Sequence, residues 1–358
     1  MTPPLPETVD DLTAAWFADV LGREVTAAEV VDRSSGTTGR ALVALRGDPA
    51  LPATVFVKLA PFHERQRALV DKTGMGVTEA RFYRDLAAEI PVRVPQVVFA
   101  DADGTGYVMV LEDLAASGCT FPRPDDADVA VRTADIVAEL AGLHAPYWES
   151  PRFAADGDLA WLVERGTRGG SGGRFFVENA VKEIGAEMDA TWHRLAELYL
   201  AHTDAIVDLW RSGPRTLVHG DNHSGNLFVD PTLDSVTGAA GRTGFLDWAV
   251  VQAGPGMRDV SYVLCNSVPV DVRAAIERDL VDDYCARLAS AGVAYDPAVA
   301  WDEHRVHAVY SWLSAATTAG MGSQWQPVHI GMAAARRTSA ACAHLDSIAI
   351  LEQRLGLV

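Results

Sequence analysis

The sequence predicts an α+β fold in which a small, mostly antiparallel sheet region precedes a larger, mainly helical region. Short β-like runs separated by Gly and Pro turns fill the first 115 residues, whereas long helical periods dominate the rest. The 358 residues are 49% hydrophobic and 22% charged, which is the usage of a folded globular chain rather than a disordered or fibrous one. We therefore expect two parts, a sheet part at residues 1–113 and a helical part at residues 114–358.

The first part begins with a helix, because residues 9–21 place apolar side chains on one face at helical spacing. Three β-like runs separated by turn-forming Gly and Pro follow at 25–33, 41–46 and 53–59. Thr78 can cap a helix that runs to Pro91. Two further apolar runs lie at 96–100 and 107–111. The first three runs predict an antiparallel meander, and the first 115 residues as a whole predict a mostly antiparallel sheet with one inserted helix.

The second part is predicted to be helical at about 128–145, 186–211, 271–291, 298–319 and 332–355. A β-like island interrupts it at 217–230 and 244–251. The Gly-rich stretch 165–175 fits either a lid over a substrate or a disordered connector, and both interpretations stay open. No charged residue occurs from Val306 to Ala335, but Gly, Gln and Pro interrupt this stretch, so we expect a buried helix rather than a membrane span.

The charge balance argues against two classes of partner. Lys and Arg number 30 against 48 for Asp and Glu, so the net charge of −18 repels nucleic acid and anionic lipid surfaces. The acidic start resembles no signal or transit peptide, and the four separated cysteines show no CxxC spacing. We expect a cytoplasmic protein with reduced core thiols, a small-molecule partner, and an oligomeric state that the sequence leaves open.

The densest polar cluster, His219 to Asn226, is bracketed by apolar strands. Asp221 and Asn226 on one loop suit phosphoryl transfer, since a carboxylate can orient a hydroxyl and an amide oxygen can bind Mg²⁺. A simple turn would use the same residue types. Asp247 weakens that alternative, because it also ends an apolar run and offers a second hard oxygen ligand.

Lys58 lies inside the apolar run Thr54–Leu59, and only three of the 30 basic residues are Lys. A compact ammonium suits contact with the α and β phosphates of a nucleotide, whereas the alternative is a solvent-facing strand residue. Glu79 on the following helix is a candidate partner, with Glu64 as a rival. Backbone N–H groups and hydroxyls of the loop residues Ser35, Gly36 and Thr37 are candidates for phosphate contacts.

The order of several motifs resembles the aminoglycoside phosphotransferase and choline kinase-like superfamily, in particular its ecdysteroid-kinase-like branch. The motifs are VFVK, TEARFY, VLEDL, LAGLHA, VHGDNHSGN, FLDW and GPGMRDVSYVL, spanning about Val55 to Leu264. This resemblance implies a bilobal protein-kinase-like fold that binds ATP, or GTP as an alternative, with Mg²⁺. A small-molecule hydroxyl would be the acceptor, such as that of an antibiotic, a sugar, a nucleoside-like compound or an amino alcohol.

The resemblance also implies residue roles. Asp221 would be the catalytic base, Asn226 and Asp247 the Mg²⁺ ligands, and Lys58 the phosphate contact. The backbone from Glu112 to Leu114 would meet the adenine. The stretch from Leu233 to Arg242 would form a hairpin between the two metal ligands.

The sequence also suggests roles for the two loop histidines and for residues of the helical part. We expect His219 to brace the loop through Asp259, and His223 to face the phosphates or the substrate. Candidates for lining an acceptor pocket are the acids Asp125, Asp126, Glu178, Glu183 and Glu187 and the aromatics Trp312 and Trp325. Two alternatives apply to the whole chain. One is a nucleotide-binding module without turnover. The other is a metallophosphoesterase, because such enzymes also use Asp, Asn and His near GD and GNH sequence strings, which HGDNHSGN resembles.

Overall fold

A computed structural model describes residues 3–163, 170–322 and 328–358, and it divides into two compact units. Unit 1 comprises Met1–Thr120, Phe228–Leu233 and Gly244–Val251, and unit 2 comprises Phe121–Leu227, Asp234–Thr243 and Gln252–Val358. Two short segments from the second half of the chain therefore belong to the unit that the first half builds.

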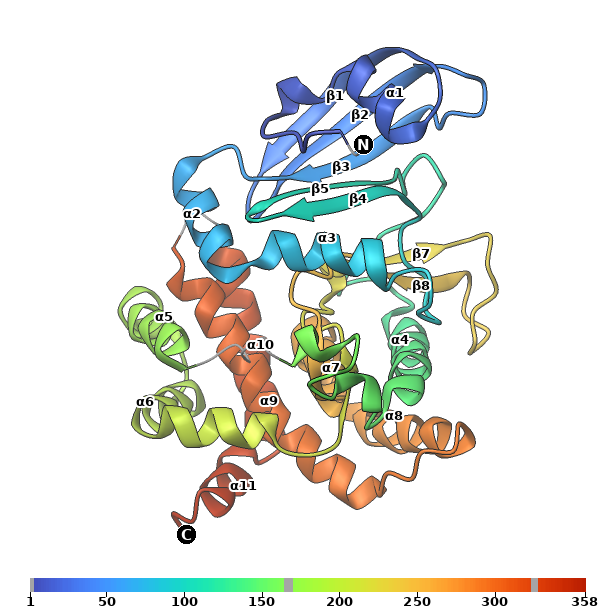
Figure 1. The fold of residues 1–358 in the computed structure, drawn as a ribbon. Helices are drawn as coiled ribbons and strands as arrows, with labels where there is room; N and C mark the ends of the chain where they lie inside the picture. The colour runs from blue at the N-terminus through green and yellow to red at the C-terminus, as the bar shows by residue number, and fades with distance from the viewer. Residues whose placement is uncertain (1–2, 164–169, 323–327) are drawn as a thin grey trace. The chain divides into compact units, whose positions relative to one another are not determined.

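Unit 1 contains a five-stranded antiparallel sheet with the order β1-β2-β3-β5-β4 (Figure 1). Its strands are β1 (Val25–Ser35), β2 (Gly39–Gly47), β3 (Thr54–Leu59), β4 (Val97–Asp103) and β5 (Gly106–Glu112). The predicted antiparallel sheet is confirmed, with each strand within a few residues of its expected bounds.

The two faces of this sheet differ in what covers them. The short 3-10 turn η1 (Val9–Asp11) precedes helix α1 (Ala14–Leu21), which packs its aromatic side chains against Val43, Val55 and Val57 to form the core of unit 1. Helix α3 (Met75–Asp85) contacts β4 and β5 (Figure 1). Because successive side chains on a strand alternate between faces, residues adjacent to the core valines, including Lys58, lie on the face opposite α1.

Helix α2 (Glu64–Thr73) was not predicted, and α3 begins at Met75 rather than at the expected cap Thr78. The three consecutive apolar residues of α2, at 68–70, do not repeat at helical spacing, so the sequence pattern lacks an apolar stripe there. Gly74 has a left-handed φ of 62°, which ends α2 and allows α3 to start immediately. Gly74 thus joins two helices where the sequence pattern indicated one.

Unit 2 is mainly helical. Its helices are α4 (Val129–His144), α5 (Gly170–Glu183), α6 (Ala190–Arg211), α7 (Met257–Ser267), α8 (Val270–Ser290), α9 (Pro297–Gly320), α10 (Val328–His344) and α11 (Ser347–Arg354). Short 3-10 turns occur at η2 (Ala145–Tyr147), η3 (Pro151–Phe153), η4 (Ala160–Leu162), η5 (Gly185–Glu187) and η6 (Ser224–Asn226). Strands β6 (Arg215–Val218) and β9 (Gln252–Pro255) pair antiparallel.

Four helices of unit 2 differ from expectation. Helices α5 and α7 were not predicted, and the helix expected at 332–355 is two helices. The break follows from Asp346, which has a left-handed φ of 51° that a continuous helix cannot contain. Residues 170–175 of the Gly-rich stretch begin α5, and residues 165–169 lie outside the described residues.

The hairpin predicted between the two metal-ligand candidates is present. Strands β7 (Leu227–Asp230) and β8 (Arg242–Phe245) pair with each other. In unit 2, Asp135 of α4 is fully buried and accepts hydrogen bonds from the Thr243 N–H at 3.1 Å and the Thr243 hydroxyl at 2.5 Å. Arg132 of α4 binds Asp135 at 3.2 Å and the carbonyl of Ala240 at 2.6 Å. The segment between the strands is thereby fixed to α4.

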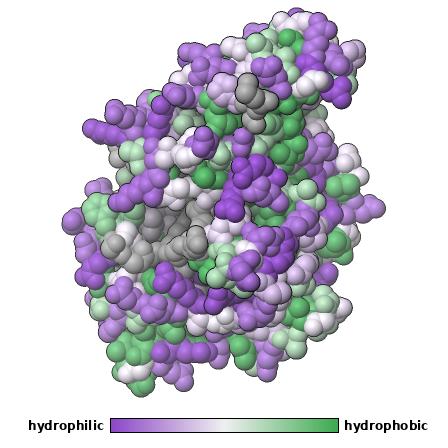
Figure 2. Space-filling model, viewed as in Figure 1, coloured by the Kyte–Doolittle hydropathy of each residue, from purple (hydrophilic) through white to green (hydrophobic). Residues whose placement is uncertain are grey.

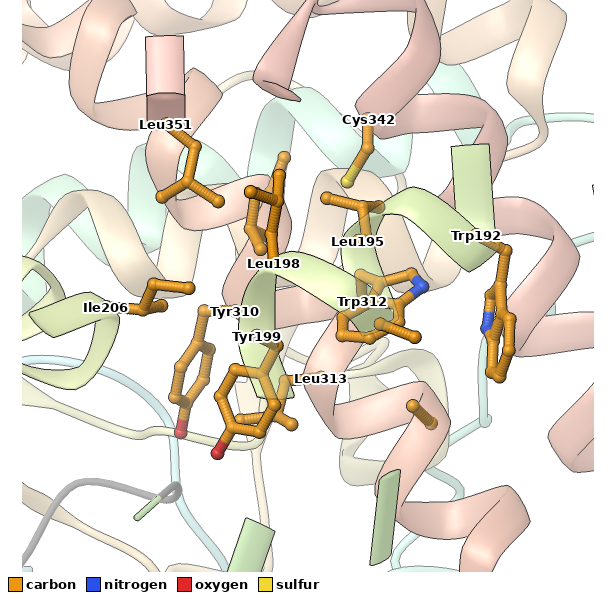
Figure 3. Packing of buried hydrophobic residues seen from close by; sticks show 14 of the residues in the cluster. Trp192, Leu195, Leu198, Tyr199, Ile206, Tyr310, Trp312, Leu313, Cys342 and Leu351 are labelled. Carbon is orange, nitrogen blue, oxygen red and sulfur yellow. The ribbon is translucent and has the colours of Figure 1, made fainter. Parts of the chain in front are cut away.

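The core of unit 2 is aromatic. In Figure 3, Tyr199, Tyr310 and Trp312 lie among leucine side chains in the cluster that α6 and α9 build. Trp312 is fully buried, so it packs the core and is not exposed to stack on a substrate. Trp325, the other aromatic candidate for such stacking, lies outside the described residues.

All four cysteines are buried and none forms a disulfide. Across the described parts of the chain, every helix is too short or too polar to span a bilayer. The face seen in Figure 2 intersperses hydrophilic with hydrophobic residues rather than showing one broad apolar area.

Candidate active site

Lys58 and Glu79 form a buried ion pair in unit 1. The Lys58 Nζ lies 2.6 Å from the Glu79 carboxylate, and the two residues are 4% and 0% exposed. Burial raises the pKa of Glu79 from 4.5 to about 7, against the opposing charge of Lys58. Glu64, the rival partner, is exposed at the start of α2. The ammonium is therefore held at a fixed place on the sheet.

Asp247 follows β8 and meets the same ammonium. Its Oδ1 lies 3.4 Å from Lys58 Nζ, and its Oδ2 lies 3.8 Å from Nη2 of Arg40. Asp247 has a φ of 63°, a conformation that non-glycine residues adopt at a cost and that clusters at functional sites. The next residue, Trp248, stacks on Phe82 of α3 at 4.1 Å between ring centroids, which anchors this turn to unit 1.

The sheet face that carries Lys58 is apolar toward its other end. In the strand register, Arg40 pairs with Lys58, Leu42 with Phe56, and Phe56 with Leu111. Residues paired in this way share a face, so two cationic side chains lie at one end and apolar side chains follow. Such a surface complements a purine nucleotide, which has an apolar base and an anionic phosphate chain.

The chain leaving β5 is fixed by its own hydrogen bonds. The Glu112 carboxylate pairs with Arg93 at 2.8 Å, and the Glu112 N–H donates to the carbonyl of Gln96 at 2.9 Å. The Leu114 carbonyl accepts from Cys119 N–H at 2.9 Å. The Leu114 N–H is not used in these turn bonds. Of the backbone groups expected to meet an adenine, the Glu112 N–H is thus already committed within unit 1.

The loop between β1 and β2 is tightly folded. The N–H of Gly36 donates to the carbonyl of Thr38 at 3.0 Å across Thr37. The Ser35 hydroxyl accepts from the Phe62 N–H and donates to the Gln66 side chain, each at 3.0 Å. The hydroxyl of Ser35 therefore serves to hold this loop against the start of α2, and a phosphate contact through it would compete with these bonds.

In unit 2, Asp259 of α7 holds the loop that follows β6. Asp259 is fully buried, and its two carboxylate oxygens accept from the N–H groups of His219 at 2.6 Å and Gly220 at 2.9 Å. Burial alone would raise the pKa of Asp259, but bonds and charge from His144 and the loop lower it below 3.8. The sequence analysis predicted that His219 braces the loop through Asp259. In the structure, the main-chain N–H of His219 makes this bond to the Asp259 carboxylate.

The Asp221 carboxylate lies next in this loop and is held by Tyr262, which is also on α7. The Tyr262 hydroxyl donates to Asp221 Oδ1 at 2.5 Å and lies 2.7 Å from the hydroxyl of Ser314 on α9. The carboxylate is thus oriented by two helices. Tyr262 follows Asp259 by three residues, which places both on one face of α7.

Asn226 is buried at the end of the loop. Its amide nitrogen donates to the Asp221 carbonyl at 2.8 Å, which turns the amide oxygen away as an acceptor. The Asp247 carboxylate is the corresponding acceptor in unit 1. An amide oxygen and a carboxylate are hard ligands of the kind that Mg²⁺ takes beside phosphate oxygens, so the chemistry of each residue by itself fits that ion.

The two loop histidines make short-range bonds. The His219 Nδ1 accepts from the Asp221 N–H at 3.2 Å, and the His223 Nδ1 accepts from the Gly225 N–H at 3.0 Å. His223 is half-buried. Because its ring accepts this N–H at the start of η6, it stabilises the 3-10 turn that contains Asn226. Both histidines therefore shape the loop.

The structure brings Lys58, Glu79 and Asp247 together in unit 1, and Asp221 and Asn226 together in unit 2. The sequence analysis did not single out three further contributors, namely Arg40, Tyr262 and Ser314. The helical spacing of Tyr262 from Asp259 was a usable signal, whereas the position of Ser314 becomes apparent only when α9 is packed.

The acidic residues proposed for an acceptor pocket mostly lie in surface ion pairs or solvent. Glu178 pairs with Arg174 at 3.4 Å and Glu187 with Arg336 at 3.2 Å. Asp125, Asp126 and Glu183 are exposed or half-buried. They therefore behave as solvated helix and loop residues here.

A family model described as the phosphotransferase enzyme family matches residues 29–298. A Ralstonia eutropha JMP134 protein assigned as an aminoglycoside phosphotransferase is 15% identical with a TM-score of 0.53, covering 95% of this chain and 98% of that one. Choline kinase from Cryptosporidium parvum Iowa II is 12% identical with a TM-score of 0.50, covering 92% and 90%. No curated protein matches the chain in sequence. The family match and the two similar structures confirm the expected protein-kinase-like fold.

Proposed function

Because the chain belongs to the phosphotransferase enzyme family, we propose that it transfers the γ-phosphate of ATP to a hydroxyl of a small molecule with the help of Mg²⁺. The observation that carries the proposal is the Lys58–Glu79–Asp247 cluster at the cationic end of an otherwise apolar sheet face. Residues 1–113 would supply most of the nucleotide contacts, and residues 114–358 the catalytic loop and the acceptor pocket. GTP remains the alternative nucleotide.

Lys58 is proposed to bind the α and β phosphates. Its partner Glu79 keeps the ammonium extended, so little side-chain freedom is lost when the nucleotide binds. Leu42 and Phe56, which are half-buried on the same face, would contact the base. The backbone from Glu112 to Leu114, including the N–H of Leu114, would meet the edge of the base.

Asp221 is proposed to accept the proton of the acceptor hydroxyl. Tyr262 holds the carboxylate through one of its oxygens, which would orient Asp221 toward the acceptor hydroxyl. Asn226 and Asp247 would hold Mg²⁺, whose charge neutralises the β and γ phosphates when it is bound. Most of the catalytic effect would then come from positioning and electrostatics.

The acceptor is proposed to be a small hydroxylated compound such as an antibiotic, a sugar, a nucleoside-like molecule or an amino alcohol. The support is the fold shared with a protein assigned to aminoglycosides and with a choline kinase. Aminoglycosides and choline are therefore the first compounds to test, followed by macrolides, nucleoside antibiotics and simple sugars.

The deciding experiment is a nucleotide-consumption screen over these compounds, with mass spectrometry to find a product heavier by one phosphate. With the acceptor that it identifies, Asp221→Ala should lose orders of magnitude in kcat while ATP still binds, and Asp247→Ala should weaken Mg·ATP binding. Asp279→Ala, an exposed position on α8, is the matched control and should behave as wild type. Retained turnover in Asp221→Ala would contradict the assigned base.

A further inference from the structure

We infer that Arg40 is a second phosphate-binding residue, which pairs with Asp247 in the ligand-free protein and moves to the nucleotide phosphates when Mg·nucleotide binds. This inference rests on the proposed function and adds a residue that neither the sequence motifs nor the catalytic set includes. All the side chains involved belong to unit 1.

The first argument is the placement of Arg40. It is the second residue of β2 and pairs in register with Lys58 of β3, so the two side chains share the face opposite the core. The neighbouring residue Ala41 is buried in that core, which fixes the alternation. Arg40 and Lys58 therefore form a cation pair at the end of the face proposed for the phosphates.

The second argument is how Asp247 is shared. Its two oxygens face different cations, Lys58 at 3.4 Å and Arg40 at 3.8 Å. A divalent ion on this carboxylate would weaken its attraction for both cations. Arg40, which has the longer of the two contacts, is the cation that can turn from Asp247 to the phosphates.

The third argument is mobility. The Lys58 side chain is 5% exposed and is also held by Glu79, whereas the Arg40 side chain is 42% exposed and has only the longer contact to Asp247 among the ion pairs of the described residues. Moving Arg40 therefore costs little, while moving Lys58 would leave a buried carboxylate unpaired. A guanidinium also suits phosphate, because it can donate two parallel hydrogen bonds.

The test measures binding by calorimetry, using ADP with Mg²⁺, ADP in EDTA, and adenosine. We expect Arg40→Gln to weaken Mg·ADP binding about tenfold and ADP in EDTA severalfold, and to leave adenosine binding unchanged. Arg40→Lys should recover most of the affinity, since the cation is retained. Arg33→Gln is the control for net charge, because Arg33 is an exposed residue paired with Ala41 and so lies on the other face of the sheet.

Several results would overturn the inference. Unchanged ADP affinities in Arg40→Gln would show that no phosphate contact exists. A loss confined to Mg·ADP would assign Arg40 only to holding Asp247, and an equal loss for adenosine would indicate a damaged fold. If the wild-type protein bound neither ADP nor ATP, the proposed nucleotide-dependent function itself would fail, which is a separate outcome from an effect limited to Arg40.

Discussion

Replacing Asp259 by Asn tests how the catalytic loop is held. Each carboxylate oxygen of Asp259 accepts one loop N–H, from His219 and from Gly220, in a site with no solvent exposure. Asparagine has the same shape but only one acceptor oxygen. One buried N–H would then face an amide NH₂ group and lose its partner, and the negative charge beside His144 would vanish.

The magnitude follows from these contacts. A hydrogen bond to a charged group contributes about 1.5–3 kcal/mol, and an unsatisfied buried donor costs about 1–3 kcal/mol more. We therefore expect Asp259→Asn to lower the free energy of unfolding by about 3–5 kcal/mol. For a unit of this size that corresponds to a decrease in Tm on the order of 10 °C.

The assay combines urea denaturation with amide hydrogen exchange. At neutral pH the amides of His219 and Gly220 should lose protection in the variant, while the sheet of unit 1 keeps its protection. Asp279→Asn, an exposed change of the same type on α8, should shift stability by less than about 0.5 kcal/mol. If Asp259→Asn unfolded like the control with both amides still protected, the carboxylate would not be what holds this loop.

Three other variants test separate parts of the structure. Tyr262→Phe removes the hydroxyl that holds Asp221, so kcat on the identified acceptor should fall about tenfold with an unchanged KM for ATP, and equal losses in both would argue against a positioning role. The folded-state pKa of Glu79, about 7, exceeds 4.5, so the folded state binds more protons and stability declines as pH rises between these values. Glu79→Gln should flatten that decline in unfolding measured from pH 4 to 8, and an unaltered slope would refute it. Asp135→Ala leaves Arg132 buried without its carboxylate and should cost about 3–5 kcal/mol in urea unfolding, and a loss below about 1 kcal/mol would mean that the hairpin is held elsewhere.

Long elements were predictable from local sequence, whereas several shorter helices were not. The strands of unit 1 alternate apolar side chains, α4 and α6 have an apolar face, and α8 and α9 are uninterrupted helices of 21 and 24 residues. Helix α2 lacks an apolar stripe. Helix α7 has apolar residues gathered on one face but is only 11 residues long, so it lacks a long helical period. The joins at Gly74 and Asp346 depend on left-handed backbone, which periodicity does not report.

Some residues of the candidate site could be proposed from the sequence, and others required the packed structure. Lys58, Asp221, Asn226 and Asp247 were proposed from the sequence because each is a polar residue within or beside an apolar run. Glu79 was one of two acids within reach of Lys58, and only the packing of α3 on the sheet selects it.

By itself, the sequence determined the strands of unit 1, the longer helices, the polar loop that interrupts an apolar island, and the rare lysine within a strand. These are local properties, set by side-chain periodicity and residue type. Tertiary structure alone decided which side chains meet: Arg40 reaches Asp247 across 207 positions of chain, because strand register and a turn stacked on α3 bring them together. Such contacts depend on the geometry of packing between distant segments, which no local pattern encodes.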